Sequence, residues 1–178
     1  MGVQGTLDRR SPVAETAGSE PFELMLMGGF ELRAAHEVVD VQPTSQRVLA
    51  FLALHERPLP RAYVAGALWP DTTEGKAAAN LRTALWRLVP HGGIVCAGLG
   101  HLSLLDGVWV DVRFVHQVAR QVREVADCRT PSRFDSLRGE LLPGFWDEWL
   151  VFERERLRQE CIHVNERRCL AALQNTAT

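Results

Sequence analysis

The sequence has no long run of apolar residues. A membrane-spanning helix needs roughly 20 consecutive apolar residues, and no stretch of the chain approaches that length. Residues 1–20 are rich in Gly, Ser, Thr and Pro with few large apolar side chains, so they lack the apolar core of a signal peptide. We therefore expect a cytoplasmic protein that does not enter a membrane, with residues 1–20 as a disordered arm.

Catalytic and metal-ligand spacings are also missing. The cysteines show no paired spacing of a zinc site, so free buried thiols are expected at Cys96, Cys128, Cys161 and Cys169. The histidines are scattered over predicted strands, turns and helix faces, and no ligand or triad spacing emerges. The sequence thus predicts no metal site, no cofactor and no enzyme.

Several short motifs have a catalytic interpretation and a structural one. The HGG motif at 91–93 lacks the nucleophile elbow that should accompany an oxyanion loop, so a helix-ending turn is favoured. Asp147-Glu148 is favoured as a helix start over an acid/base pair. The GLG motif at 98–100 lacks the strand-to-helix context of a phosphate loop. Trp146 and Trp149 are favoured as packing anchors over a cofactor site.

Charge is unevenly distributed along the chain. The net charge is -2, which is unusual for a DNA-binding protein. Residues 44–105 contain six basic and three acidic residues and are net positive, while residues 1–43 and 106–178 are net negative. A surface that attracts phosphates is therefore expected within residues 44–105. Because the surplus is modest, we expect a dimer or tandem copies on repeated DNA sites to be the working form.

Three helices are predicted in close succession within this positive segment. Thr44-Ser45 is expected to cap the first helix, and Arg57-Pro58 to end it. The second helix is predicted from Arg61 to Trp69 and is stopped by Pro70. The apolar stripe of the first helix consists of Val48, Leu49, Phe51, Leu52 and His55.

The third predicted helix, from about Glu74 to Val89, separates apolar from polar residues. Leu81, Ala84, Leu85 and Leu88 fall at i, i+3, i+4 and i+7 and are expected to be buried. Asp71 is expected to cap the helix, with Glu74 in the capping-box position. Polar faces are usually only solvated, but these side chains can also bond base edges or phosphates in a major groove. The outward residues are Lys76, Ala79, Asn80, Thr83, Trp86 and Arg87, with Arg82 on the flank.

Short strands are predicted on both sides of the helices. Segments 22–27, 30–33 and 38–41 are expected to form a small antiparallel sheet before them. After them, segments 94–96 and 101–104 form a predicted hairpin, and 108–110 is another short strand. Strands, three helices and a hairpin are the order of a winged helix-turn-helix, in which the hairpin is the wing. This context favours DNA recognition over a merely solvated helix face.

Four motifs in one order resemble the Streptomyces antibiotic regulatory protein family. They are LMGGFEL at 26–32, QRVLA at 46–50, LWPD at 68–71 and NLRTAL at 80–85. The second half is similar to the opening of that family's bacterial transcriptional activation domain, with VDVRF at 110–114, GELLPG at 139–144, then Trp149 and ERERLR at 153–158. The resemblance covers about Phe22 to Leu173.

The resemblance implies a fold that is mainly α with small β. It implies an OmpR-like winged-helix DNA-binding domain over residues 21–110 and a truncated helical activation domain over residues 111–178. It further implies an activator of secondary metabolism that binds promoter repeats and contacts RNA polymerase or its sigma factor, through the loop from Pro70 to Gly75.

Within this hypothesis, the third helix enters the major groove of double-stranded DNA. Asn80, Thr83 and Arg87 read bases, while Lys76 and Arg82 hold phosphates. The wing, over residues 94–104, lies over an adjacent minor groove.

A second function stays open because the sequence departs from the family pattern. Val89-Pro90-His91 stops the third helix and adds no fixed positive charge, and the activation domain is short. The alternative is a protein-interaction module that binds another regulator or RNA polymerase without reading DNA itself.

Two further helices are predicted in the second half. One carries the stripe Phe114, Val115, Val118, Val122, Val125 and Ala126; the other starts near Asp147 and carries Leu150, Leu157, Cys161, Val164 and Ala171 on one face. Packing of these helices on each other and on the winged helix is favoured over a dimer seam. Because family members continue into further helices, an uncovered apolar face is expected to meet a second copy or a partner, with self-association through residues 112–173.

Overall fold

The computed structural model describes residues 22–124, 131–137 and 139–176. The predicted disordered arm at residues 1–20 lies outside the described residues, as do Val125, Ala126 and Cys128. The described part is mainly helical with two small sheets, in agreement with the predicted fold class. None of its helices is long and apolar enough to cross a membrane.

The first sheet has four strands in the order β3-β2-β1-β7. The first three form an antiparallel meander, as predicted, and Ala35 and His36 turn the chain between β2 and β3 with positive φ angles of 49° and 72°. The fourth strand pairs in parallel with β1, with Glu23 opposite Trp109, a pairing that the sequence did not predict. The strands are β1 (Phe22–Met25), β2 (Glu31–Ala34), β3 (Glu37–Val39) and β7 (Trp109–Val110).

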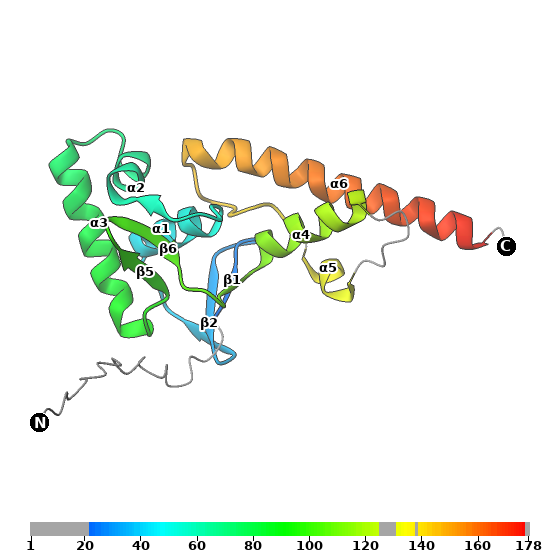
Figure 1. Cartoon of the computed structure of the whole chain (residues 1–178), viewed down its shortest axis with the longest axis horizontal. Coiled ribbons are helices and arrows are strands. Elements are labelled where there is room, and N and C mark those ends of the chain that lie inside the picture. The colour runs from blue at the N-terminus through cyan, green and yellow to red at the C-terminus, as the bar shows by residue number, and fades with distance from the viewer. Residues whose placement is uncertain (1–21, 125–130, 138, 177–178) are drawn as a thin grey trace, which may run out of the picture.

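Three helices and a second sheet follow the meander, in the predicted order (Figure 1). The hairpin of this sheet gains a third strand, β4, which contains Pro60 and lies at the sheet edge, where a missing N–H is tolerated. The helices are α1 (Pro43–Ala53), α2 (Arg61–Leu68) and α3 (Glu74–Leu88). The strands are β4 (Leu59–Pro60), β5 (Val95–Gly98) and β6 (His101–Leu104), in the order β4-β6-β5.

Both predicted helix caps were wrong. Helix α1 begins at Pro43, whose fixed φ suits a first helical position, so Gln42 occupies the N-cap and Thr44-Ser45 lies inside the first turn. Helix α3 has Thr73 at its N-cap, without a side-chain hydrogen bond, and Asp71 lies exposed two residues earlier. The helix starts are therefore fixed by backbone geometry and tertiary packing, without help from these side chains.

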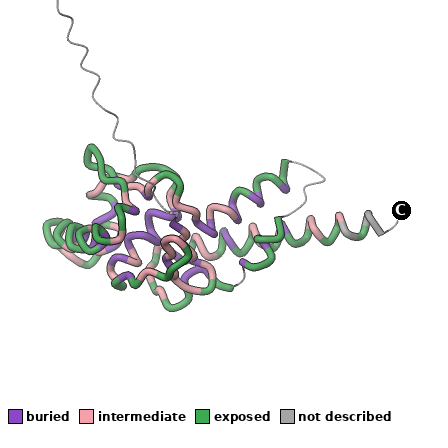
Figure 2. The backbone as a smooth tube through the Cα atoms, turned by 90° about the horizontal axis from the view of Figure 1, so that it is seen from below, coloured by how far each residue is buried: buried purple, intermediate pink, exposed green. Residues whose placement is uncertain are grey.

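The second half contains α4 (Asp111–Glu124), the short α5 (Ser132–Ser136) and the long α6 (Glu148–Thr176). Helix α6 packs against α4, and Leu150, Leu157 and Val164 are buried within this single chain. The expected packing of these helices on each other is confirmed. Figure 2 shows that burial is concentrated in the body, while the C-terminal part of α6 extends beyond it.

The two tryptophans at the start of α6 have different environments. The ring of Trp149 meets Phe51 of α1 edge-on, with centroids 5.2 Å apart, so its predicted role as a packing anchor is confirmed. Trp146 is 90% exposed, and the same prediction was wrong for it. Trp146 precedes the helix, and the salt bridge between Asp147 and Arg47 of α1 holds the next residue instead.

A buried carboxylate connects the first sheet to α4. Asp111 is fully buried, and its Oδ2 accepts hydrogen bonds from the backbone N–H groups of Leu26 and Met27, both at 2.8 Å. Its Oδ1 accepts from the N–H of Val112 at 2.7 Å, in the first turn of α4. Burial raises the pKa of this carboxyl above its ordinary value, and the three backbone hydrogen bonds oppose that rise.

Two residues later, Arg113 joins α4 to the end of α1. Its guanidinium donates to the backbone carbonyls of Ala53 at 2.9 Å, Leu52 at 3.1 Å and His55 at 2.9 Å. These carbonyls lie at the C-terminal end of α1, where helical partners are missing. Contacts therefore cross the domain boundary predicted after residue 110, and the division itself stays a prediction.

Replacing Asp111 with Asn tests this connection. An amide keeps one acceptor oxygen, so at least one buried N–H group would face another donor, and we expect the free energy of unfolding to fall by about 2 to 4 kcal/mol. Urea denaturation followed by circular dichroism measures the change. The exposed Asp106→Asn variant is the matched control, and equal losses in both variants would show that the buried bonds are unimportant.

Candidate nucleic-acid interface

Helix α3 lies at one side of the molecule beside β5 and β6 (Figure 1). Leu81, Ala84 and Leu88 are buried, as the apolar stripe predicted, and Ala77 extends this stripe toward the N-terminus. Leu85 is only half-buried, which corrects the prediction for that residue. The buried stripe leaves the opposite side of α3 free for a partner.

A hydrogen bond from α1 holds α3 in place. The hydroxyl of the buried Ser45 donates to the backbone carbonyl of Ala84 at 2.9 Å. The sequence predicted Ser45 as part of a helix cap, and the structure shows that its hydroxyl binds the neighbouring helix instead. The bond fixes the rotation of α3 about its own axis, and hence the direction of its exposed side.

Four predicted site residues form a ridge along α3. Lys76, Asn80, Thr83 and Arg87 are spaced by four, three and four residues, which places them on one side of the helix. Lys76, Thr83 and Arg87 are exposed, and Asn80 is half-buried. The ridge combines two cations with two groups that can hydrogen-bond.

The other two predicted site residues lie off this ridge. Arg82 and Trp86 line a depression of about 280 Å³, together with Arg61 of α2 and with Val95 and Ala97 of β5. Trp86 is 73% exposed. The structure therefore does not bring Arg82 onto the ridge, and it adds Arg61, which no sequence motif marked.

The hydroxyl of Thr83 is already used within α3. It donates to the backbone carbonyl of Ala79 at 3.0 Å, one turn earlier. With this bond in place, Thr83 can accept a hydrogen bond but has no hydroxyl proton to offer a base edge.

The cations of α3 have no carboxylate partner among the residues that the structure describes. Arg47, Arg154 and Arg168 each make ion pairs within the protein, but Lys76, Arg82 and Arg87 make none there. Their positive charge is thus available to an anionic partner.

The hairpin beside α3 is tied to the start of α2. Leu104 lies opposite Val95, and His101 opposite Gly98, while Gly100 accepts a hydrogen bond from the N–H of Arg61 at 2.9 Å. Leu99 occupies the tip with a φ of 49° and is completely exposed. The hairpin that was predicted over residues 94–104 is confirmed.

Helix α3 ends at Leu88, one residue before the predicted end at Val89, and Pro90 follows shortly after it. Val89–His91 forms a short 3-10 helix, and Gly92 then turns the chain with a φ of 87°, a left-handed conformation that favours glycine. The HGG motif is a helix-ending turn, as favoured from the sequence.

The free thiols are less buried than predicted. Cys161 is half-buried, and burial raises the pKa of its thiol, but Cys96 and Cys169 are exposed. Cys96 lies opposite Ser103 of β6, on the face of the sheet away from the buried Leu102 and Leu104. Within the described ranges, no group of three or more His, Cys, Asp and Glu side chains could hold a metal ion.

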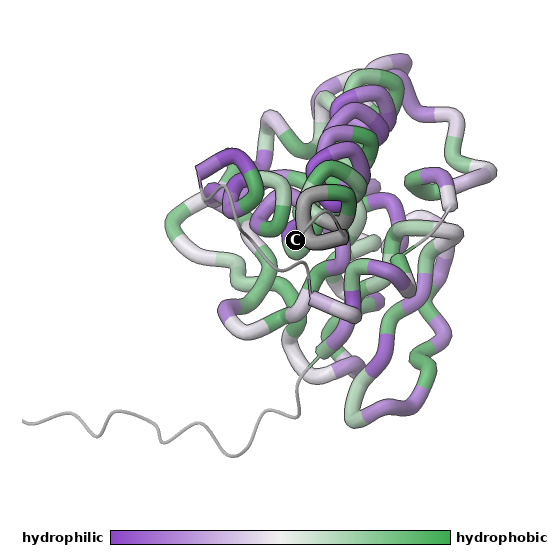
Figure 3. The backbone as a smooth tube through the Cα atoms, turned by 90° about the vertical axis from the view of Figure 1, so that its right-hand side faces the viewer, coloured by the Kyte–Doolittle hydropathy of each residue, from purple (hydrophilic) through white to green (hydrophobic). Residues whose placement is uncertain are grey.

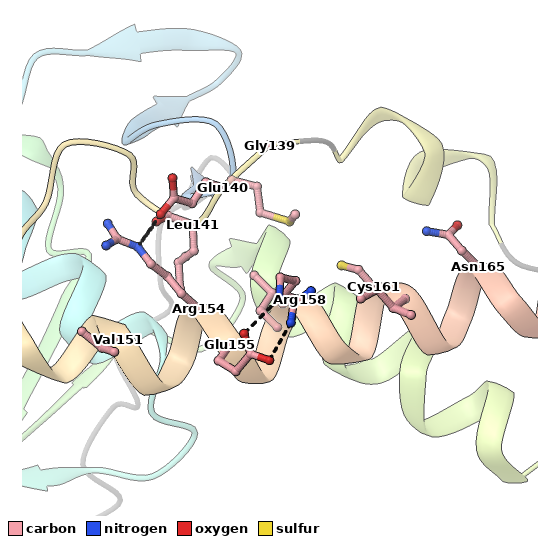
Figure 4. Close-up of a pocket in the computed structure, with 12 residues that line it drawn as sticks. Gly139, Glu140, Leu141, Val151, Arg154, Glu155, Arg158, Cys161 and Asn165 are labelled. Carbon is pink, nitrogen blue, oxygen red and sulfur yellow. Dashed lines mark hydrogen bonds and ion pairs between the residues drawn. The ribbon is translucent and has the colours of Figure 1, made fainter.

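A larger depression, of about 760 Å³, runs along α6 (Figure 4). It is lined by Val151, Leu157 and Ile162 of α6 and faces Met27 and Leu141. Arg158 and Glu155 form an ion pair at 2.9 Å at its edge, and hydrogen bonds from Arg158 and Gln159 lower the pKa of Glu155 to about 2. Hydrophilic and hydrophobic residues alternate along α6 (Figure 3).

Comparison with known proteins shows the fold alone. No family model matches the chain, and no curated protein does. Among solved structures, the chain is similar to Mycobacterium tuberculosis EmbR in complex with a low-affinity phosphopeptide, with 19% sequence identity and a TM-score of 0.53. The match covers 86% of this chain but only 44% of the EmbR chain.

Replacing Ser45 with Ala tests how α3 is held. The variant loses one buried hydrogen bond, but Ala84 keeps its place in the helix, so we expect the free energy of unfolding to fall by about 1 kcal/mol. Thermal and urea unfolding measure the loss, with the exposed Ser132→Ala variant as the control. No difference between the variants would mean that apolar packing alone orients α3.

Proposed function

We propose that this protein is a sequence-specific DNA-binding transcriptional regulator with a winged-helix fold. The observation that carries the proposal is the exposed side of α3 beside the hairpin β5-β6, where Lys76, Arg82 and Arg87 have no carboxylate partner within the described part of the chain. A helix of this kind fits the major groove, and the adjacent hairpin serves as a wing over the neighbouring minor groove.

The likeness to EmbR supports this proposal at the level of the fold. It also gives coarse support to the resemblance to the Streptomyces antibiotic regulatory protein family, in which an OmpR-like winged helix precedes an activation domain. We propose the same division here, with residues 21–110 binding DNA and residues 111–178 forming a short activation domain.

We assign the contacts to DNA residue by residue. Asn80, Thr83 and Arg87 read base edges, with Thr83 acting as an acceptor because its proton is used by Ala79. Lys76 holds a phosphate on the ridge side, and Arg82 holds one on the opposite flank, where Arg61 adds further positive charge.

The loop between α2 and α3 is the proposed contact to RNA polymerase or its sigma factor. Pro70 and Thr72 line a depression of about 350 Å³ between these helices, and Glu74 lies at its edge. This surface lies at the N-terminal end of α3, so the ridge stays free for DNA. Contact with polymerase would make the protein an activator.

A mobility-shift titration against the region upstream of its own gene tests DNA binding. We expect a complex that competes poorly with unrelated DNA and weakens as salt rises, because each neutralised phosphate contributes a slope of about -0.9 to log K against log salt. Absence of a complex even at low salt would favour the alternative, a module that binds another regulator or RNA polymerase without reading DNA.

The variants Arg87→Ala and Lys76→Ala separate base readout from phosphate contact. We expect Arg87→Ala to cost about 1 to 3 kcal/mol on the preferred sequence and to relax sequence choice. Lys76→Ala should weaken all sequences alike and reduce the salt slope by about 1. Titrations on preferred and unrelated DNA at several salt concentrations measure both effects. Identical behaviour of the two variants would refute the division of roles.

We also propose self-association through residues 112–173. Leu150, Leu157 and Val164 of α6 are buried within the chain, so a second copy would use the depression lined by Val151 and Ile162, which are exposed apolar residues. Sedimentation velocity should show a concentration-dependent dimer that Ile162→Glu reduces. A single monomeric species at high concentration would rule this out.

A further inference from the structure

The centre of the exposed side of α3 is apolar. Leu81, Ala84 and Leu88 point into the core, and at roughly 100° per residue the opposite direction is occupied by Ala79 and Trp86. Ala79 and Trp86 are seven residues apart, about two helical turns, and both are exposed. We name these two residues the central strip of α3.

The polar and charged residues lie on the two sides of the central strip. Lys76, Asn80 and Arg87 follow one side, and Arg82 lies on the other. An apolar strip with cations on both sides matches a major groove, whose floor consists of base edges and whose walls carry phosphates. The flanking cations argue that nucleic acid covers Trp86, because a protein partner would need carboxylates on both sides of its contact.

The apolar side chains of the central strip determine which groups of the DNA bases can favourably contact it. Ala79 has only a methyl group, and Trp86 offers a large ring with a single donor. Polar base edges placed against this strip would lose hydrogen bonds to water without replacement. The C5-methyl group of thymine is the apolar group that the major groove presents.

We propose that Trp86 recognises thymine methyl groups and is a specificity-determining residue of this protein. The inference rests on the proposed DNA-binding function and assigns to Trp86 a preference for thymine at the centre of the site. Ala79 lets the groove floor approach the helix, and Trp86 covers the methyl groups.

Replacing thymine with uracil tests this proposal without knowledge of the operator. The upstream fragment is amplified once with dTTP and once with dUTP, so the second product has the same base pairs but no C5-methyl groups. Burial of one methyl group corresponds to a roughly fourfold change in affinity, so we expect wild-type protein to bind the uracil fragment at least fourfold more weakly.

Variants of Trp86 assign the effect to this side chain. We expect Trp86→Ala to bind both fragments with equal affinity, and Trp86→Phe, which keeps an apolar ring without the indole N–H, to retain the preference for thymine. Trp146→Ala is the matched control, because it removes another exposed tryptophan, outside α3, and should keep the wild-type ratio. Circular dichroism verifies that each variant is folded.

The possible outcomes are distinct. Equal affinity of the wild-type protein for both fragments overturns the role of thymine methyl groups. A preference for thymine that Trp86→Ala retains in full overturns the role of Trp86 and points to DNA shape or to another residue. Unchanged DNA affinity in the Trp86→Ala variant also overturns the proposed role of Trp86, and indicates that the exposed ring contacts a protein. Absence of binding to either fragment removes the proposed function itself, and the inference with it.

Discussion

The carboxylate of Asp111 determines how the two halves of the chain are oriented. It ends β7, starts α4 and holds the N–H groups that follow β1, so one side chain joins three elements. An ionised or protonated carboxyl so deeply buried is tolerated only where its oxygens have partners. The direction in which α4 leaves the sheet therefore follows from Asp111, and the direction of α6, which packs along α4, follows in turn.

The position of α3 depends on the same framework through a short series of contacts. Arg113 binds the carbonyls at the end of α1, and Ser45 at the start of α1 binds the carbonyl of Ala84 in α3. The salt bridge between Arg47 and Asp147 connects α1 to the start of α6 as well. Helix α1 thus lies between the buried side of α3 and the helical second half, and every contact in the series is made by a polar group with a defined direction.

The sequence predicted local features well and distant partners poorly. The spacing of Leu81, Ala84 and Leu88 reported the buried side of α3 correctly, because periodicity depends only on the helix that contains it. The pairing of Trp109 with Glu23 joins residues more than 80 positions apart, as do the bonds of Asp111 to the N–H groups that follow β1, and no local pattern records such partners. Trp146 and Trp149 have the same residue type and lie near the same helix start, yet tertiary packing leaves the first ring exposed and half-buries the second against Phe51.

The end of α3 before Pro90 limits how many base pairs one copy of this helix can contact. From Lys76 to Arg87 the ridge is about 16 Å long at 1.5 Å per residue. At roughly 3.4 Å per base pair, it spans a recognition sequence of about five base pairs. A sequence of that length recurs by chance roughly once per 1,000 base pairs, in genomes that offer about a million or more competing sites. Selective binding in a genome therefore requires several copies of the protein on repeated recognition sequences, and the length of α3 sets the length of each repeat.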